Sequence, residues 1–391
     1  MRIAIVVPYD LAEEGGVKSH AFHLAAAMRR AGDQVEVIGP LSRGSAPPHV
    51  RGFGGVVNIR ANGADNHMSL LASPWAVGRY VRERAFDVIH LHEPMVPPLS
   101  YYALWASTGA ACVATFHMYA EKEPAPSPRR PGRAGPGDLP LLHAGIAVSR
   151  AAADYAAVVW RRPLHVIPNG VPTDLFTPGT NGSPPKPGAP LRLLFVGNWR
   201  DTRKGLPILL DAYRRLLASG LAVSLDVIGE GSPGPDMSSL PGTTFHGAVA
   251  VEKLADHYRH CDIFVSPATG QESFGIVLLE AMASGRAVVC SDIRGYRDVA
   301  NPEGFRLVPA GMRGHWLRRW RRWPAIRRGG KRWGPQTGHG HLPTTGRALA
   351  DRVRSVYREA VAERSLGRAT AAACSPRATV QPRSAGVKPP G

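Results

Sequence analysis

The chain has 391 residues, which is enough for two domains that each bury a sizeable core. Its formal net charge is +18, but residues 312–391 hold 18 of the 48 basic and 3 of the 30 acidic residues, which leaves 30 basic and 27 acidic residues in 1–311. The body of the chain is therefore near neutral. Nucleic-acid binding would have to depend on the basic end alone, and we expect no nucleic-acid partner.

Cysteine usage and hydropathy predict a cytoplasmic protein. The four cysteines are scattered, with no pair at Cys-x-x-Cys spacing, which argues against a disulfide framework or a zinc site and suits a reducing compartment. The sequence has no run of about 18 apolar residues, the length that a membrane-spanning helix needs. The first apolar run, at 3–7, is too short for the core of a signal peptide.

Short apolar runs alternate with helical spacing over residues 1–177, which predicts a first parallel α/β domain. The predicted elements are strands at 3–8, 34–39, 86–91 and 113–116, and a helix at 17–31 that stops at Gly32. Residues 178–190, PGTNGSPPKPGAP, are typical of a linker because proline and glycine interrupt both helices and strands.

The same alternation resumes after the linker and predicts a second α/β domain over 191–311. The predicted elements are strands at 191–196, 225–228, 263–265 and 287–290, a helix at 206–218, and a helix that starts near 275 and stops at Gly285.

Two carboxylates stand eight residues apart in the second domain. Glu272 lies in a loop just before a predicted helix, and Glu280 lies about two turns into that helix. A helix N-terminus is a natural seat for a phosphate, and paired carboxylate oxygens suit the vicinal hydroxyls of a sugar or ribose. The plainer alternative is that Glu272 caps the helix while Glu280 is a solvated surface charge.

The segment GQESFGIVLLEAMASG, followed by a strand and Ser-Asp, resembles the donor-site signature of the GT4 retaining glycosyltransferases. It resembles most of all the signature of the phosphatidylinositol mannosyltransferases. The resemblance covers roughly 1–311 and 348–362. It implies a GT-B fold, in which two Rossmann-like domains face a central cleft. It further implies that Glu272 reaches the transferred sugar and that Glu280 holds the nucleotide ribose. The backbone amides of Ser273, Phe274 and Gly275 would contact the diphosphate.

Other positions also match this family. Gly16, in Gly15-Gly16-Val17, matches a glycine loop beside the donor phosphates, although an ordinary flexible turn is the alternative. Thr-Phe-His at 115–117 matches the motif of the active-site histidine, which makes His117 a catalytic candidate. Arg203 and Lys204 precede a helix and are candidate ligands of the diphosphate. The candidate acceptor residues are Tyr9, Lys18 and Asn62.

Three departures from the family pattern leave other functions open. Asn198 occupies a position where the family usually has arginine, so that Arg200 or Arg203 would have to compensate. Residues 121–140 are rich in proline where the family has a helix. Val249-Ala250-Val251 stands where guanine-binding relatives often carry an acid, which leaves the base of the nucleotide open. Asn198, together with the break in the family pattern at 312–347, motivates the alternative of a catalytically impaired protein that binds a nucleotide sugar.

Two further motifs suggest functions that we regard as coincidental. Residues 229–234 match Gly-x-Gly-x-x-Gly after a strand, as in an NAD-dependent oxidoreductase, but prolines crowd the segment that should form the phosphate-binding helix. His90 and His92 have the spacing of a metal-binding pair, but no third ligand is evident, which favours core or loop histidines. The chain has no Asp-x-Asp motif, and we expect neither a metal nor another cofactor.

Residues 312–347 do not fit the family, since they hold ten basic residues, no acidic residue and four of the eight tryptophans. One interpretation is a cationic, tryptophan-rich surface that contacts anionic membrane lipids, which would place the protein at the inner face of the membrane. The other is a shift of reading frame, because Arg-Trp pairs three residues apart are what a shifted Ala/Leu helix would encode in GC-rich DNA. A helix is predicted at 348–363 and disorder at 364–391.

Taken together, the sequence predicts a glycosyltransferase that moves a hexose from a nucleotide sugar to a lipid or a small-molecule acceptor. GDP-mannose and phosphatidylinositol are the leading donor and acceptor.

Overall fold

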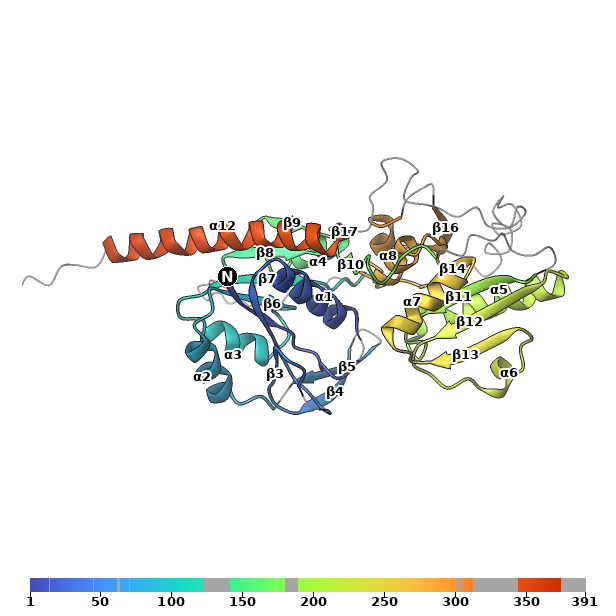
Figure 1. Ribbon diagram of the computed structural model, residues 1–391, viewed down its shortest axis with the longest axis horizontal. Helices are drawn as coiled ribbons and strands as arrows, with labels where there is room; N and C mark the ends of the chain where they lie inside the picture. Colours follow the sequence, from blue (N-terminus) through green and yellow to red (C-terminus); the bar gives the residue numbers. More distant parts are fainter. Residues whose placement is uncertain are drawn as a thin grey trace, which may run out of the picture.

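The computed structural model describes residues 1–13, 15–44, 46–61, 64–69, 71–121, 141–179, 189–300, 304–311 and 344–373. The predictions for Asn62, for most of 121–140, for 312–343 and for 374–391 therefore lie outside the described residues. Figure 1 shows two α/β domains next to each other, with the last helix, α12, lying along the N-terminal one.

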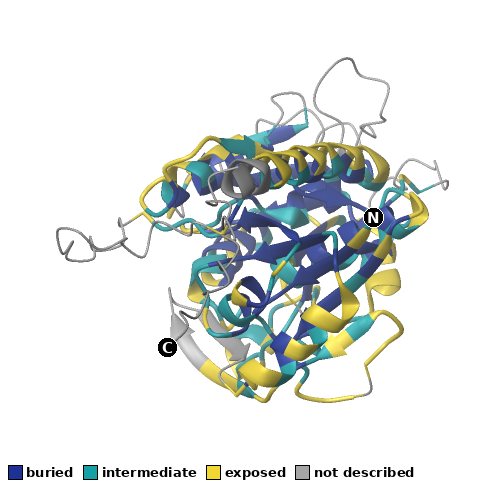
Figure 2. Cartoon of the chain, turned by 90° about the vertical axis from the view of Figure 1, so that its left-hand side faces the viewer, coloured by how far each residue is buried: buried dark blue, intermediate teal, exposed yellow. Residues whose placement is uncertain are grey.

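The N-terminal domain is built on a seven-stranded parallel sheet in the order β3-β2-β1-β6-β7-β8-β9. Its strands are β1 (Arg2–Val6), β2 (Gln34–Gly39), β3 (Val50–Gly52), β6 (Val88–His92), β7 (Ala111–Phe116), β8 (Ala144–Ala147) and β9 (Leu164–Val166). Its helices are α1 (Gly16–Arg30), α2 (Pro74–Arg84), α3 (Leu99–Trp105) and α4 (Arg150–Ala156), and β4 (Val56–Ala61) and β5 (Ala64–Ser69) form a hairpin. The central strands β6 and β7 are buried along their whole length, as strands of a sheet covered on both faces must be (Figure 2).

The C-terminal domain repeats this plan with six parallel strands in the order β13-β12-β11-β14-β15-β16. The strands are β11 (Leu191–Val196), β12 (Val223–Ile228), β13 (Thr243–Gly247), β14 (Ile263–Ser266), β15 (Ala287–Asp292) and β16 (Phe305–Pro309). The helices are α5 (Leu206–Ala218), α6 (Pro235–Ser238), α7 (Val251–His260), α8 (Ile276–Ala283) and α9 (Arg294–Arg297), with a 3-10 turn at Thr202–Lys204.

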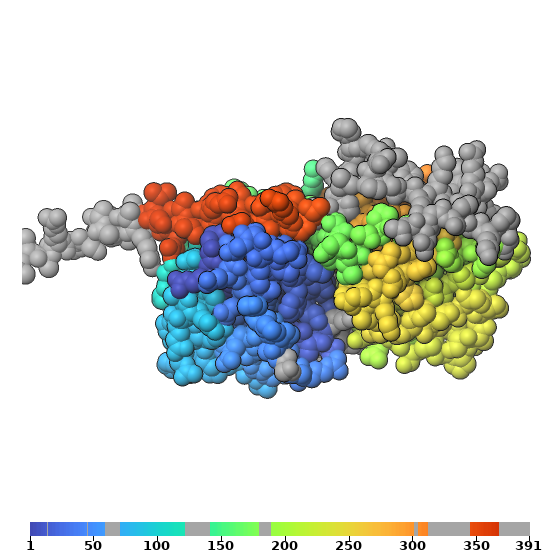
Figure 3. Space-filling model, in the orientation of Figure 1, coloured from blue at the N-terminus to red at the C-terminus, as the bar shows by residue number. Residues whose placement is uncertain are grey.

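Helix α12 (Gly346–Ala373) returns to the N-terminal domain. The short strand β17 (Thr344–Thr345) pairs in parallel with β10 (Gly170–Val171), just before the helix begins. The apolar face of α12 is buried in the core formed by β1, β7 and α1, through Leu349, Ala350, Val353, Val356, Tyr357 and Ala360. Figure 3 shows the helix lying over the N-terminal domain.

The predicted end of α12 was wrong. The prediction placed the helix at 348–363 and disorder from 364, whereas α12 runs to Ala373. The physical reason lies in the composition of the added turns. The segment Arg368-Ala-Thr-Ala-Ala-Ala is rich in alanine, which has the highest helix propensity, but it lacks the apolar periodicity on which the prediction relied.

The two domains contact each other through α4 and α9. The backbone amide of Arg150 donates to Asp298 Oδ2 at 2.7 Å, and Arg294 pairs with Asp154. Ala147, Val148 and Ala152 belong to the same buried cluster as Ile293 and Tyr296. This contact joins the end of strand β8 to the helix that follows β15.

Candidate active site

The predicted site residues lie just beyond the carboxyl ends of parallel strands. Tyr9 follows β1, His117 follows β7, Lys204 follows β11 and Glu272 follows β14. Ligands of open α/β sheets bind at this edge, because the loops there leave the sheet and the helix N-termini point toward it. The two domains thus each contribute residues from their ligand-binding edge.

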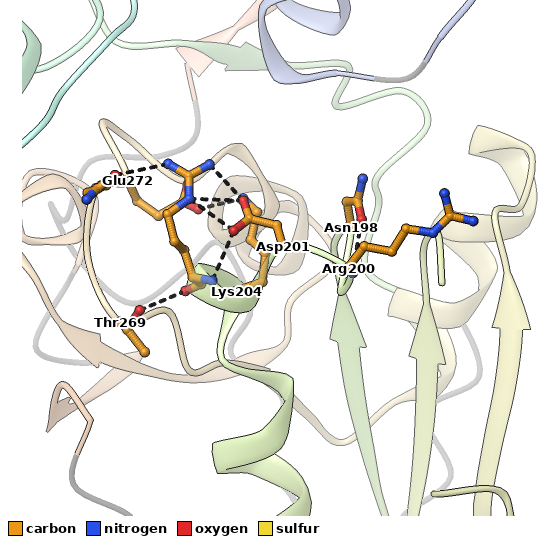
Figure 4. A network of polar contacts seen from close by, with 8 residues as sticks. Asn198, Arg200, Asp201, Lys204, Thr269 and Glu272 are labelled. Atoms are coloured by element: carbon orange, nitrogen blue, oxygen red, sulfur yellow. Dashed lines mark hydrogen bonds and ion pairs between the residues drawn. The ribbon is translucent and has the colours of Figure 1, made fainter. Parts of the chain in front are cut away.

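Lys204 and Glu272 are brought together by the order of the strands in the sheet. Strands β11 and β14 are hydrogen-bonded neighbours, so the loops that follow them lie side by side. Lys204 Nζ donates to Glu272 Oε1 at 2.5 Å (Figure 4). Gly205, at φ +74°, allows this approach, since a Cβ there would lie 2.0 Å from the carbonyl oxygen of Pro267.

Arg203 also lies in this group. Its guanidinium donates to both carboxylate oxygens of Asp201, and its Nη1 lies 3.4 Å from Gln271 Oε1. Figure 4 shows that Arg200, by contrast, lies on the other side of Asp201 with Asn198 and apart from Glu272. Of the two arginines expected to compensate for Asn198, Arg203 therefore reaches Gln271, the neighbour of Glu272 in the loop.

The loop that carries Glu272 has an unusual backbone. Gly270, Gln271 and Gly275 all have positive φ values, of 151°, 58° and 84°, and Gly275 is the N-cap of α8. Gly295 packs against the carbonyl of Glu272, where an added Cβ would lie 1.8 Å from the oxygen. The loop thus packs against α9, which fixes the backbone at Glu272.

Glu280 is buried, with 8% of its surface exposed, and its Oε2 accepts a hydrogen bond of 2.9 Å from the Tyr258 hydroxyl. Burial raises the pKa of Tyr258 well above its usual value, and the neighbouring Glu280 adds to the shift. Tyr258 therefore remains a hydrogen-bond donor over the whole physiological pH range. The alternative that Glu280 is a solvated surface charge is wrong.

His117 belongs to a buried group of four histidines. Its Nε2 lies 2.8 Å from His92 Nδ1, and its backbone amide donates to Glu93 Oε1 at 2.6 Å. The centroid of the His90 ring lies 4.5 Å from that of His92, with the two rings tilted, and His90 Nδ1 lies 2.7 Å from the hydroxyl of Tyr357 on α12. The interpretation of His90 and His92 as core histidines agrees with this burial.

A fourth imidazole, which the His-x-His motif does not include, completes this group. His20 on α1 lies with its ring centroid 5.2 Å from that of His117 and 5.5 Å from that of His92. One nitrogen of each of these three rings lies within 4.8 Å of the others, so a metal ion is sterically conceivable here. The only indication of this residue in the sequence was that His20 lies on the inner face of the predicted helix 17–31.

Burial controls the charge of the group. It lowers the pKa of His20 and of His90 to about 3 and that of His117 well below its usual value, so these rings are neutral at pH 7. Burial also raises the pKa of Glu93 to about 7, opposed by its hydrogen bonds from the backbone of His117 and Met118. Glu93 follows His92 directly, and the sequence-based analysis did not single it out.

Two candidate acceptor residues, Tyr9 and Lys18, and the donor candidate Gly16 lie in or next to α1 and the loop after β1. Tyr9 is near Glu93, and burial together with the carboxyl raises the pKa of the phenol. Lys18 Nζ lies 3.4 Å from the carbonyl oxygen of Leu11, so its ammonium contacts the loop after β1. Gly16 is the first residue of α1, and a Cβ built on it would meet no protein atom within 4 Å.

Gly16→Ala separates a ligand-binding role from a structural one. Gly16 has neither a positive φ nor a close neighbour, so alanine should leave stability unchanged or raise it slightly. If donor phosphates approach this backbone, the added methyl group should weaken donor binding at least about tenfold, which is about 1.4 kcal/mol. Calorimetric titration and thermal melting measure both effects. Gly304→Ala, which also meets no atom within 4 Å, is the matched control.

The glycine motif at 229–234 has a different explanation from dinucleotide binding. The Trp199 indole covers Gly231, where a Cβ would lie 2.3 Å from the ring, and Trp199 Nε1 donates to the Gly229 carbonyl at 3.2 Å. The helix that follows, α6, has only four residues. Gly231 thus accommodates a tryptophan side chain.

Two models of protein families match the chain, one in each domain. Residues 14–175 match Glycosyltransferase Family 4, and residues 190–318 match Glycosyl transferases group 1. A sucrose-phosphate synthase from Thermosynechococcus elongatus has a similar structure, with a TM-score of 0.61 at 20% identity over 95% of this chain and 99% of the other. The pneumococcal O-GlcNAc transferase GtfA gives a TM-score of 0.66 at 11% identity, over 92% and 99%. Both structures share the fold of this chain.

Fold, site and family models together define a glycosyltransferase with the GT-B fold, as predicted. A phosphatidyl-myo-inositol mannosyltransferase of Mycobacterium leprae is 36% identical over 321 residues, which cover 80% of this chain and 84% of the relative. The enzyme of the same description from Propionibacterium freudenreichii is 31% identical over 327 residues, or 81% and 82%. The chain belongs to the family of these phosphatidyl-myo-inositol mannosyltransferases, which confirms the resemblance seen in the sequence.

Proposed function

We propose that the protein transfers mannose from GDP-mannose to the inositol ring of phosphatidylinositol, with retention at the anomeric carbon. The observation that carries this proposal is the convergence of Lys204 and Glu272 at the edge of the C-terminal sheet, inside a chain that is 36% identical to phosphatidyl-myo-inositol mannosyltransferases. A cation beside a carboxylate suits a donor that carries a diphosphate at one end and sugar hydroxyls at the other.

In the proposed mechanism, positive groups stabilise the departing diphosphate. Lys204, Arg203 and the amides at 273–275 supply this charge, in a site where preorganised donors lower the barrier most. Glu272 orients the transferred sugar, and Glu280 holds the ribose. The family is thought to use a front-face mechanism, in which the leaving phosphate helps to deprotonate the acceptor hydroxyl, so that no covalent nucleophile is required.

On the acceptor side, His117 lies next to the reacting face of the sugar, while Tyr9, Lys18 and Asn62 contact the acceptor. Burial keeps the His117 imidazole neutral, so we propose that it acts as a hydrogen-bonding group rather than as a cation. We propose that no metal or other cofactor takes part in transfer, because Lys204 and Arg203 supply positive charge near Glu272.

Calorimetric titration with GDP, UDP and ADP, followed by a transfer assay with the matching sugar nucleotide, tests the proposed function. We expect GDP to bind most tightly and mannosylated phosphatidylinositol to form in the presence of EDTA. Tighter binding of UDP or ADP would contradict the proposed donor. GDP-mannose binding without transfer to any lipid would instead support the alternative suggested by Asn198, that the protein binds a nucleotide sugar but is catalytically impaired.

We propose that the N-terminal domain contacts anionic membrane lipid. This contact would bring the protein to its lipid acceptor at the inner face of the membrane. Leu71, Trp75 and Trp105 are 69%, 81% and 66% exposed, and α2 also carries Arg79, Arg82 and Arg84. Exposed tryptophan next to arginine suits the headgroup region of a bilayer. Among the described helices, none is long and apolar enough to cross a membrane.

Trp75→Ala should reduce sedimentation with vesicles that contain phosphatidylinositol several-fold, because it removes the most exposed tryptophan of α2. Vesicles of phosphatidylcholine alone should bind weakly, since they lack the negative charge that attracts the arginines. Val251→Ala, which shortens an exposed apolar side chain of the C-terminal domain, is the control. Equal binding by wild type and the Trp75 variant would argue against this membrane face.

A further inference from the structure

Three potential metal ligands meet on the C-terminal domain, outside the group around Lys204 and Glu272. Asp226 lies on β12, His246 on β13 and His257 on α7. Each offers one ligand atom, and these atoms all lie within 4.8 Å of one another. His246 Nε2 lies 2.6 Å from Asp226 Oδ1, and the rings of His246 and His257 have their centroids 4.5 Å apart.

Two of these residues are unusual for their local structure. Asp226 lies on the half-buried face of the strand Val-Ser-Leu-Asp-Val-Ile, although aspartate is depleted in strands. His246 is the extra residue of a β-bulge, because Val227 pairs with Phe245 while Ile228 pairs with Gly247. Bulges turn a side chain away from its regular direction. Neither feature is explained by the packing of the core.

The neighbouring charged groups are engaged elsewhere. Arg192 pairs with Asp262 at 3.0 Å, Asp256 pairs with Arg259, and His260 Nδ1 contacts the Asp256 carbonyl at 2.7 Å. Among the described residues, no lysine or arginine forms an ion pair with Asp226. The partner of the Asp226 carboxylate is His246.

We infer that Asp226, His246 and His257 form a binding site for a divalent transition-metal ion, with zinc as the best match. Two imidazoles and one carboxylate are a donor set that zinc takes at about 2.0–2.2 Å, with water as the fourth ligand. The side chains of His246 and Asp226 are 27% and 37% exposed, so an ion and its water reach them directly. Metal binding requires the three donor atoms to draw together and replaces the hydrogen bond between Asp226 and His246.

Such an ion would cross-link three elements of the domain. His246 and His257 lie on either side of the loop 248–250, which joins β13 to α7. The segment that leads into this loop, Phe245-His246-Gly247, resembles the segment that frames the nucleotide base in GT4 enzymes. A bound ion would fix both ends of the loop and thereby tighten nucleotide binding. This consequence depends on the proposed function, whereas the metal site itself does not.

Calorimetric titration of the untagged full-length chain with zinc chloride tests the site, and cobalt(II) gives a visible absorption spectrum of its ligand field. We expect one zinc ion per chain at this site and a rise in the thermal unfolding temperature. His246→Gln and His257→Gln should each weaken zinc binding at least about tenfold, since even the loss of an outer-shell partner costs about 10- to 100-fold. His260→Gln, on the same helix, should leave the affinity unchanged.

Unchanged zinc affinity in both the His246 and the His257 variants would overturn the inference. So would loss of binding in His20→Gln alone, because that result would assign the ion to the buried histidines of the N-terminal domain. GDP titrations with and without zinc test the effect on the loop separately. If GDP affinity does not rise with zinc while the metal still binds, the link to the nucleotide is overturned and the metal site stands. Failure of GDP to bind at all would count against the proposed donor instead.

Discussion

Lys204→Ala should lower the rate of sugar transfer about 100- to 1,000-fold, the usual cost of removing one preorganised group that stabilises developing charge. In the structure the ammonium lies 2.5 Å from Glu272, at the point where loops from β11 and β14 meet. If the proposed mechanism holds, the donor diphosphate takes the place of this carboxylate as the partner of Lys204 during the reaction. The loss should appear mainly in kcat, because charge on the diphosphate develops as the sugar departs.

Arg200→Ala is the matched control for this experiment. Arg200 is an exposed cation of the same loop that lies apart from Glu272, so its loss should change kcat by less than about threefold, within the range expected for a screened surface charge. Thermal melting of both variants checks that the fold is retained. A Lys204 variant that keeps most of its activity would refute the assignment of this residue to the leaving group, whatever its effect on nucleotide affinity.

The free energy of unfolding should fall steeply as the pH is lowered from 6.5 to 5. The pKa of His20 and of His90 is 6.5 in the unfolded chain and about 3 in the folded one, so the unfolded state binds more protons in this interval. Each of the two costs up to about 1.4 kcal/mol per pH unit, or about 3 kcal/mol together between pH 6.5 and 5. His92 and His117 act in the same direction.

Glu93 opposes this trend. Its pKa rises from 4.5 to about 7 on folding, so the folded state binds a proton that the unfolded state lacks, and acid stabilises the fold through this group by about 2 kcal/mol over the same interval. Urea unfolding at a series of pH values measures the sum. His90→Gln should reduce the loss of stability in acid, whereas Glu93→Gln should increase it. Parallel curves for wild type and both variants would show that these groups are not responsible.

Much of the fold follows from the sequence because the strands are short, buried and separated by glycine or proline. The predicted elements at 34–39, 191–196 and 206–218 coincide with β2, β11 and α5. Each is an apolar run or a periodic segment with a clear stop, and local information is then sufficient. The family resemblance supplied the rest of the architecture, since the order of strands in a sheet is not encoded in any one segment.

What local patterns miss is the contact between distant segments. His90 and Tyr357 are 267 positions apart, and His246 and Asp226 meet only because β12 and β13 are neighbours. The docking of α12 on the N-terminal domain was not predicted for the same reason. A helix pattern shows that one face is apolar but does not show which domain covers it. The roles assigned to the site residues remain predictions that the variants above address.

The return of α12 has a consequence for the order in which the protein is made. Residues between Val171 and Thr344 form the C-terminal domain and its two connections, so this domain is inserted into the other. The domain that leaves the ribosome first therefore lacks its last helix until about 200 further residues, up to Ala373, have been added, roughly 10–40 s at typical elongation rates. During this time the apolar surface of α1 that Val353 and Val356 will cover is exposed to water. The domain begun first is completed last.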